Sequence, residues 1–139
     1  MLVKNYYSII NSAFSGSQRV VKEIESGKDE KPNGFIAVND SSILLRYGSG
    51  DTAASVDDYK LNEEIGTVKG TIVQTENSTS VIGVIANTGS ESIMIKELGI
   101  SVNIKVLSSS YTVLFSRTVL DAPIELLPGD IISINTQFA

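Results

Sequence analysis

Acidic side chains are the residues of this chain whose types and spacing could do chemistry. Two adjacent pairs, Asp57/Asp58 and Glu63/Glu64, could supply the two carboxylates that a glycosidase places across a cleft. Adjacent acids on an irregular segment point in different directions, so the spacing disfavours this use. Asp51 lies with the first pair in a loop rich in Gly and Ser and could offer oxygen ligands to calcium, but the spacing is not that of an EF-hand. We therefore predict a solvated acidic turn and no metal site.

Two residue types that are missing from the sequence argue against an enzyme. The chain has no histidine, which is the usual general base and the commonest zinc ligand, and no cysteine. It has no G-x-S-x-G motif and no Ser-x-x-Lys in a helical context. Gly48-Ser49-Gly50 begins like a phosphate-binding loop, but the third glycine and the lysine of that motif are missing. We expect no catalytic residues, no cofactor and no small-molecule substrate.

Composition indicates one folded acidic domain. The 139 residues are 42% apolar and 19% charged, which is too hydrophobic for a disordered chain. The apolar stretches are far shorter than the roughly 18 residues that a membrane-spanning helix needs, and the first ten residues do not have the form of a secretion signal. A net charge of −5 repels phosphate backbones. We predict neither a membrane nor a nucleic acid as partner.

The first 34 residues differ from the rest of the chain. Apolar side chains recur there at spacings of three and four, which predicts a helix over residues 3–14 that ends before Gly16. The side chains on this stripe are Leu2, Tyr6, Ile9, Ile10 and Phe14. Residues 19–31 mix charges of both signs and indicate a solvated surface, and residues 27–34 indicate a loop or linker. The helix either docks on a neighbouring subunit as an arm or caps the core of its own domain.

Residues 35–139 have the pattern of a β domain. Short runs rich in Val, Ile and Thr alternate with Gly, Asn, Ser and Asp about every ten residues, and there is no room for crossover helices. We predict an antiparallel β-sandwich of jelly-roll or immunoglobulin-like type, with the short N-terminal helix attached to it. The expected strands are residues 35–38, 42–47, 67–74, 80–87, 92–98, 101–106, 111–116 and 131–136, with a possible short strand at 123–127.

Several connections carry turn signals. Gly48 and Gly50 permit a positive φ or a close backbone approach, and the loop that they begin is long enough to carry Tyr59 and Leu61 back onto the β domain. Leu127-Pro128-Gly129-Asp130 predicts a type II turn, in which proline sets the first central angle and glycine accepts the second. The three serines at 108–110 indicate a hairpin turn.

Three groups of motifs over residues 43–136 resemble those of small virion proteins of tailed bacteriophages. The first is a G-x-G-x-T … D-Y-x-L stretch, here Gly48 to Thr52 and Asp58 to Leu61. The second is a strand pair of the form N-x-[ST]-G … I-x-E-[LI]-G-[LI]; the chain has Asn87-Thr88-Gly89 and then Ile95, Glu97, Leu98, Gly99 and Ile100. The third is an R-x-V-L … P … L-x-P-G-[DQ] ending, formed by Arg117 to Leu120, Pro123 and Leu127 to Asp130.

This resemblance implies a β-sandwich used in the capsid, neck or tail of a virion, and it implies no catalytic residues. The partners would be other virion proteins and copies of the chain itself, and the protein would be made in the host bacterial cytoplasm. The predicted assembly contacts are Tyr6, Ile10, Phe14, Tyr59, Glu97 and Arg117. Glu97 and Arg117 each lie beside a predicted strand, where they could pair across the sandwich or across a subunit boundary.

A second hypothesis is a binding module whose loops recognise a receptor protein or a glycan on a cell surface. Sugar sites usually stack aromatic rings on the sugar, and this chain has no tryptophan. The aromatic candidates in the β region are Tyr47, Tyr59, Tyr111 and Phe115. Their scarcity favours the structural role over the binding role.

Overall fold

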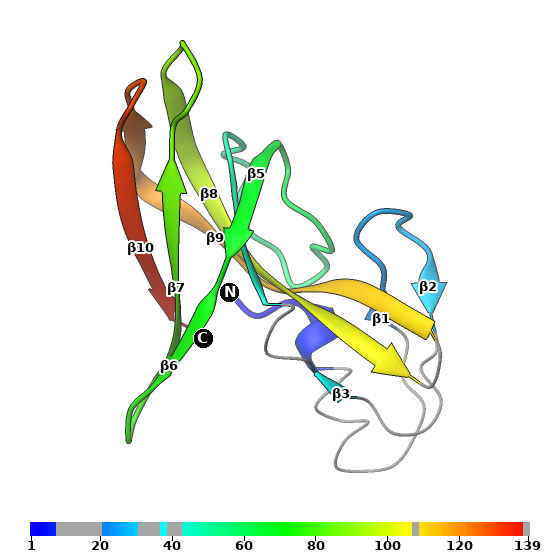
Figure 1. The fold of residues 1–139 in the computed structure, drawn as a ribbon. Coiled ribbons are helices and arrows are strands. Elements are labelled where there is room, and N and C mark those ends of the chain that lie inside the picture. The colour runs from blue at the N-terminus through cyan, green and yellow to red at the C-terminus, as the bar shows by residue number, and fades with distance from the viewer. Residues whose placement is uncertain (8–20, 31–36, 39–42, 107–108, 138–139) are drawn as a thin grey trace.

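The computed structural model describes residues 1–7, 21–30, 37–38, 43–106 and 109–137 (Figure 1). These residues are mostly β, as the sequence predicts, and their sheets are antiparallel. The strands are β1 (Val21–Lys22), β2 (Asp29–Glu30), β3 (Ala37–Val38), β4 (Leu44–Gly48), β5 (Glu64–Lys69), β6 (Thr71–Gln74), β7 (Thr79–Ala86), β8 (Ile93–Val106), β9 (Ser109–Leu126) and β10 (Ile131–Gln137). No helix in the described part is long and apolar enough to cross a membrane.

A long hairpin of β8 and β9 runs across the whole molecule (Figure 1). Each of these strands was predicted as two, with breaks at residues 99–100 and 117–122, and this prediction is wrong. The pairing continues past Gly99 and shifts register at Ile95/Glu97 and at Ile100/Ser101. Such β-bulges bend a strand without ending it, so local turn formers do not break the ladder here. Val106 pairs with Ser109, which agrees with the predicted hairpin at the serines, although residues 107–108 lie outside the described residues.

Two larger sheets share the core. The large sheet contains β9, β8, β4 and β5, with β3 beside β4 along β8; the small sheet has the order β10-β7-β6. The chain passes from the large sheet to the small one at Gly70, so the single strand predicted at 67–74 is in fact two. A Cβ atom at Gly70 would lie only 2.6 Å from Cγ1 of Val81, which explains why a glycine occupies this bend.

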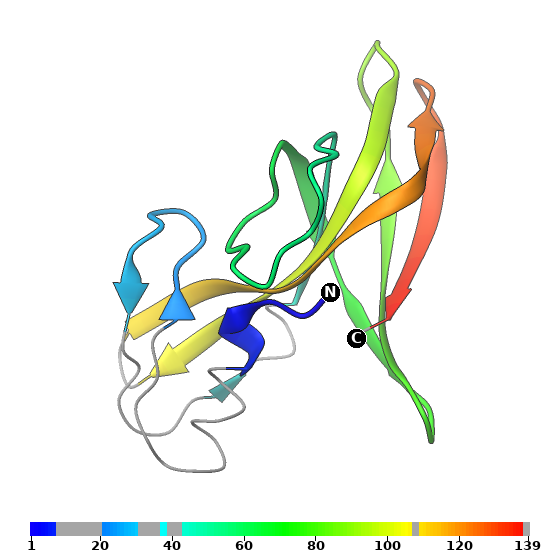
Figure 2. The ribbon, with the colours of Figure 1, turned by 180° about the vertical axis from the view of Figure 1, so that it is seen from behind.

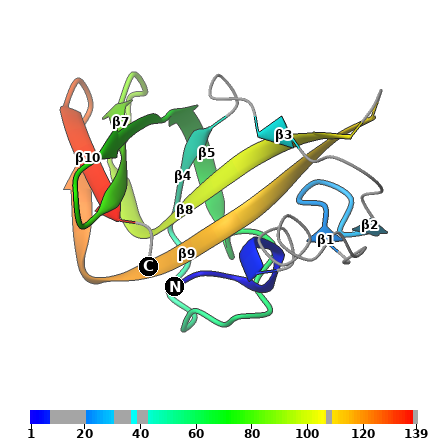
Figure 3. The same ribbon diagram turned by 90° about the horizontal axis from the view of Figure 1, so that it is seen from below.

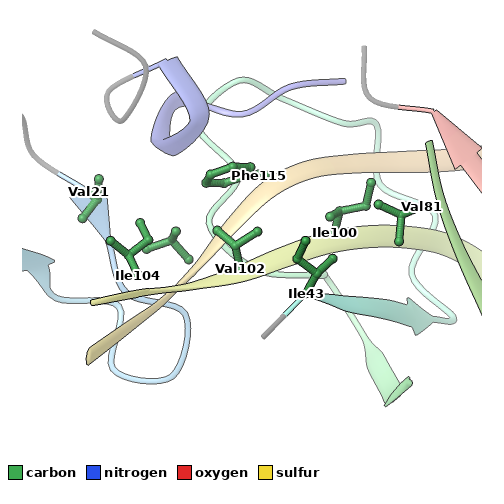
Figure 4. Close-up of a cluster of buried hydrophobic side chains, with 8 residues drawn as sticks. Val21, Ile43, Val81, Ile100, Val102, Ile104 and Phe115 are labelled. Atoms are coloured by element: carbon green, nitrogen blue, oxygen red, sulfur yellow. The ribbon is translucent and has the colours of Figure 1, made fainter. Parts of the chain in front are cut away.

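Hydrophobic side chains from both sheets meet in two clusters. One contains Leu45, Ile95, Leu98 and Leu126 from the large sheet with Ile85 and Ile134 from the small sheet. The other is drawn in Figure 4 and joins Val81 of the small sheet to Ile43, Ile100, Val102, Ile104, Val113 and Phe115, with Val21 at its far end. These clusters are where the apolar faces of the alternating strands are buried.

The described parts of the first 34 residues pack on the β region. Residues 4–7 are helical, whereas residues 8–14 of the predicted helix lie outside the described residues. Val3 is fully buried with Ile24 and Leu114, and its N–H donates to the Phe115 carbonyl. β1 and β2 form a small hairpin in the stretch that was predicted to be surface and linker, and Gly27 there has a φ of 64°. The domain boundary at residue 34 stays a prediction, with core contacts on both sides of it.

Candidate functional site

A buried ion pair joins the two long strands. Glu97 of β8 is fully buried and Arg117 of β9 is 2% exposed, and Nε of Arg117 donates to Oε2 of Glu97 at 2.8 Å. The two strands are neighbours in the large sheet, with Glu97 opposite Val119 and Gly99 opposite Arg117. The pair therefore forms within one sheet of one chain, not across the sheets. Both side chains that the sequence singled out are used inside the subunit.

The loop of residues 49–63 between β4 and β5 supplies the remaining partners of Glu97. The backbone N–H groups of Glu63 and Gly50 donate to Oε1 at 2.7 and 3.2 Å, and that of Asn62 donates to Oε2 at 3.0 Å. A buried carboxylate is tolerated when its oxygens are this well satisfied. Glu97 thus holds both ends of the loop against β8.

Arg117 holds the middle of the same loop. Its Nη1 forms an ion pair with Asp58 at 2.9 Å, and its Nη2 donates to the Thr52 carbonyl at 2.9 Å. Figures 2 and 3 show this loop and the N-terminal segment along the same side of the β8–β9 hairpin, and the Lys4 N–H donates to the Val56 carbonyl at 2.6 Å. The N-terminus, the loop and the hairpin are thereby tied into one unit.

The pKa values of the pair follow from these contacts. Burial alone raises the pKa of the Glu97 carboxyl, but the hydrogen bonds from Glu63, Asn62 and Arg117 outweigh burial and hold the pKa below its usual value. Burial alone lowers the pKa of the Arg117 guanidinium, but Glu97 and Asp58 raise it above its usual value. Both groups are therefore charged at neutral pH.

Two glycines make room for the Glu97 carboxylate. A Cβ atom at Gly48 would overlap the Glu63 carbonyl oxygen and lie 2.7 Å from Oε1 of Glu97; a Cβ atom at Gly50 would lie 2.6 Å from the same Oε1. Among the described glycines Gly27 and Gly129 have positive φ, and Gly48 and Gly50 do not. Of the two reasons that the sequence analysis left open, the structure thus selects close approach. The same loop returns Leu61 to the core, where it is 3% exposed.

The acids of the loop point to different cations. Asp51 pairs with Lys96 at 3.3 Å, Asp57 with Lys4 at 3.9 Å and Asp58 with Arg117. No group of three or more potential metal ligands occurs among the residues that the structure describes. Because the buried carboxylate and guanidinium are already satisfied by the protein itself, the arrangement acts as a structural clamp on the loop.

A pocket of about 380 Å³ lies beside this clamp and contains Tyr59. Its lining residues are Lys4, Asn5, Lys22, Asp29, Asp57, Asp58 and Tyr59. The Tyr59 ring is half-buried, with the Lys22 and Lys60 ammonium groups 5.2 and 5.7 Å from its centroid. Nδ2 of Asn5 donates to the Lys22 carbonyl, and Oδ1 of Asn5 accepts from the Lys22 N–H. The polar groups of this pocket largely bind one another.

The other predicted assembly residues lie at the N-terminus. Tyr6 packs edge-on against Phe115 of its own chain, with ring centroids 5.5 Å apart. Ile10 and Phe14 lie outside the described residues. Tyr6 thus packs on the core of its own chain, in agreement with the alternative that the N-terminal segment caps its own domain. Docking of the N-terminal arm on a neighbouring subunit stays a prediction.

The outer face of the small sheet is a candidate contact surface that was not predicted from the sequence. No residue of β6, β7 or β10 is charged, and the register places Ile131 beside Ala86, Ser133 beside Val84 and Val73 beside Ser80 on that face. Ile131 is 71% exposed, Val84 55% and Val73 38%. The predicted strands at 80–87 and 131–136 contain no charge, but the one at 67–74 contains Lys69. Only the structure assigns Lys69 to β5, and only the register shows which side chains of the small sheet point outward.

Comparison of the chain with protein-family models, with curated proteins and with solved structures finds no match.

Proposed function

We propose that the chain is a non-enzymatic structural subunit of a bacteriophage virion, located in the capsid, neck or tail, and that it acts through contacts with other virion proteins and with copies of itself. The resemblance of residues 43–136 to small virion proteins supports this role. The clamp around Glu97 and Arg117 agrees with it, because these buried charges are satisfied internally and hold a loop in place.

Within this proposal the two larger sheets stack as a β-sandwich of jelly-roll or immunoglobulin-like type. Support comes from the shared cluster in which Leu45 and Ile95 of the large sheet meet Ile85 and Ile134 of the small sheet. Gly70, at which the chain changes sheet, is the kind of corner that packed sheets use.

The observation that carries the assembly role is the outer face of the small sheet. Cores of protein interfaces are depleted in charged residues, and this face has none while it exposes Ile131, Val84 and Val73. The charges that give the chain its net −5 lie elsewhere and keep the rest of the surface solvated. A partner can therefore cover this face without removing a charge from water.

The size of the face favours a repeated contact over an isolated one. Three strands spaced about 4.8 Å apart, with about 3.3 Å per residue, present roughly 400 Å² at most. A stable pairwise interface buries roughly 800 Å² on each partner. Such a face suits a subunit that is held by several neighbours at once.

The test is quantitative mass spectrometry of virus particles purified from cultures that express the chain from its native gene. A fixed ratio of this chain to the major structural proteins is the expected result. Recovery of the chain only in the soluble fraction, separate from the particles, would overturn the proposal.

A further inference from the structure

The edges of the two larger sheets are protected differently. Strand edges left bare tend to pair with other chains, and proteins block this with charges, prolines or bulges. In the large sheet, edge strand β5 carries Glu64 and Lys69, and edge strand β9 carries Asp121, Pro123 and Glu125. In the small sheet, edge strand β6 (Thr71–Gln74) has no charge, no proline and no shift in register, and all four of its residues are exposed.

The hydrogen-bond pattern shows which backbone groups of β6 point away from β7 and have no partner among the described residues. The Thr75 N–H donates to the Ser78 carbonyl, so this pair is hydrogen-bonded. Pairs in an antiparallel ladder alternate, so Gln74 and Ile72 are not bonded to β7 and direct their N–H and C=O groups away from it. Among the described residues β7 is the one strand that pairs with β6. A groove of about 430 Å³ runs along this edge and is lined by Ile72, Gln74, Thr71, Gly70 and Lys69.

We infer that β6 pairs with β6 of a second copy of the chain, antiparallel and about a two-fold axis. This inference rests on the proposed assembly role, for which it names one partner and one contact. The antiparallel direction brings the Lys69 end of one strand to the Glu76 end of the other, whereas a parallel arrangement would place like charges together. Both side chains are exposed and have no ion pair among the described residues.

One register satisfies the open groups. Residues that face each other in an antiparallel pair lie on the same face of the sheet. Near the centre of the strand, Ile72 can therefore face either Ile72 or Gln74 of the second copy. If Ile72 faces Ile72, then Gln74 faces Gly70 of the second copy. The Gly70 N–H already donates to the Ile43 carbonyl, so the Gln74 carbonyl would have no donor in this register. The second choice joins Ile72 to Gln74 twice and leaves Val73 facing Val73 of the second copy in a non-hydrogen-bonded pair.

The consequence is a six-stranded sheet that spans two subunits. Val73 lies on the outer face of the small sheet with Val84 and Ile131, so the two outer faces become continuous across the axis. The combined face is roughly 800 Å², which is the area that one partner contributes to a stable interface. The pair of subunits is then the unit that docks on the rest of the assembly.

Cysteine cross-linking of the full-length chain tests the register, because the protein has no cysteine of its own. Facing residues in a non-hydrogen-bonded pair have Cα atoms about 4.5 Å apart, within the range that a disulfide spans. We expect Val73→Cys to form a disulfide dimer under mild oxidation. Thr71→Cys is the matched control, since it lies on the same strand and face but about 13 Å along the strand from its own copy. It should cross-link at least about tenfold more slowly.

Charge exchange tests the contact itself. Val73→Lys and Val73→Glu should each be monomeric by sedimentation, and an equal mixture of the two should recover the dimer. Equal cross-linking of the two cysteine variants, or dimers that neither charge abolishes, would overturn the inference. Absence of a β6 dimer in a chain that is still found in particles overturns this contact alone, whereas a β6 dimer of a chain that is absent from particles overturns the virion role alone.

Discussion

The large and small sheets use charge in opposite ways. The large sheet buries three of its charged side chains: Glu97 and Arg117 lie against each other, and the nearly buried Arg46 binds Ser101 and Glu64 at 2.7 and 2.8 Å. In the small sheet there are no charges, and large apolar side chains are left in solvent. The large sheet fixes a loop and the N-terminus, whereas the small sheet is the surface that we propose for partners, so the two sheets would have separate roles.

The largest expected effect is on the charged side of this comparison. Glu97→Gln removes the buried carboxylate, and Asp58 is then the one ion-pair partner of Arg117 in the part of the chain that the structure describes. Loss of one member of a buried pair costs about 3–5 kcal/mol of unfolding free energy. Chemical denaturation would measure this loss.

The control for that change lies one residue away. Lys96 pairs with Asp51 at the surface, where the two side chains are 35% and 75% exposed. Lys96→Gln should cost no more than about 1 kcal/mol. Equal losses for the two variants would show that burial does not distinguish the two ion pairs.

The second prediction concerns the space that Gly48 leaves for the Glu97 carboxylate. Gly48→Ala would force a Cβ atom into the Glu63 carbonyl and against Glu97, and overpacking of this kind costs about 1–3 kcal/mol. Gly89→Ala is the matched change, because its nearest neighbour would be Oδ1 of Asn87 at 3.4 Å. Thermal unfolding should show a clear loss for the first variant and little change for the second.

Much of the β region could be predicted from sequence because its signals are local. The strands at 80–87 and 131–136 alternate clearly and correspond to β7 and β10. The type II turn is confirmed, since Gly129 has a φ of 86° and the Asp130 N–H donates to the Leu127 carbonyl at 3.0 Å. Proline and glycine at fixed offsets determine such a turn whatever surrounds it.

The errors arose where a distant partner decides the structure. Gly99 and Ser101 have turn-forming types, yet β8 continues through them because β9 pairs along its length. Gly70 sits inside an apolar, strand-like run, but Val81 and Ile43 allow no side chain there and the chain bends. The sequence singled out Glu97 and Arg117 and predicted pairing across the sandwich or across a subunit boundary. Their contact within one sheet was out of reach for the same reason, since bulges set which residues of the two strands become neighbours.

The third prediction concerns the dependence of stability on pH, which tests the buried carboxylate of the large sheet and leaves the uncharged small sheet unaltered. The lowered pKa of Glu97 stabilises the folded state above the usual glutamate pKa, about 4.3, and this stabilisation is lost as pH falls through the lower folded value. The wild-type melting temperature should therefore fall on acidification, and Glu97→Gln should reduce this dependence. An unchanged dependence in the variant would show that other carboxyl groups cause the fall.

The smallest expected effect on folding comes from a change in the uncharged small sheet. For this change the informative measurement is assembly. Ile131 is 71% exposed on the outer face of the small sheet, so Ile131→Lys removes little buried area and should change the unfolding free energy by no more than about 0.5 kcal/mol. Lysine at this position would have to lose its hydration when a partner covers the face, so incorporation into particles should fall strongly. Ala122→Lys, at an exposed position of β9, is the matched control because it adds the same single positive charge outside the small sheet. Unfolding curves and particle incorporation measured on both variants would check the proposed division of roles between the sheets. An Ile131→Lys protein that unfolds much more easily than the control, or that is incorporated as well as the control, would contradict this division.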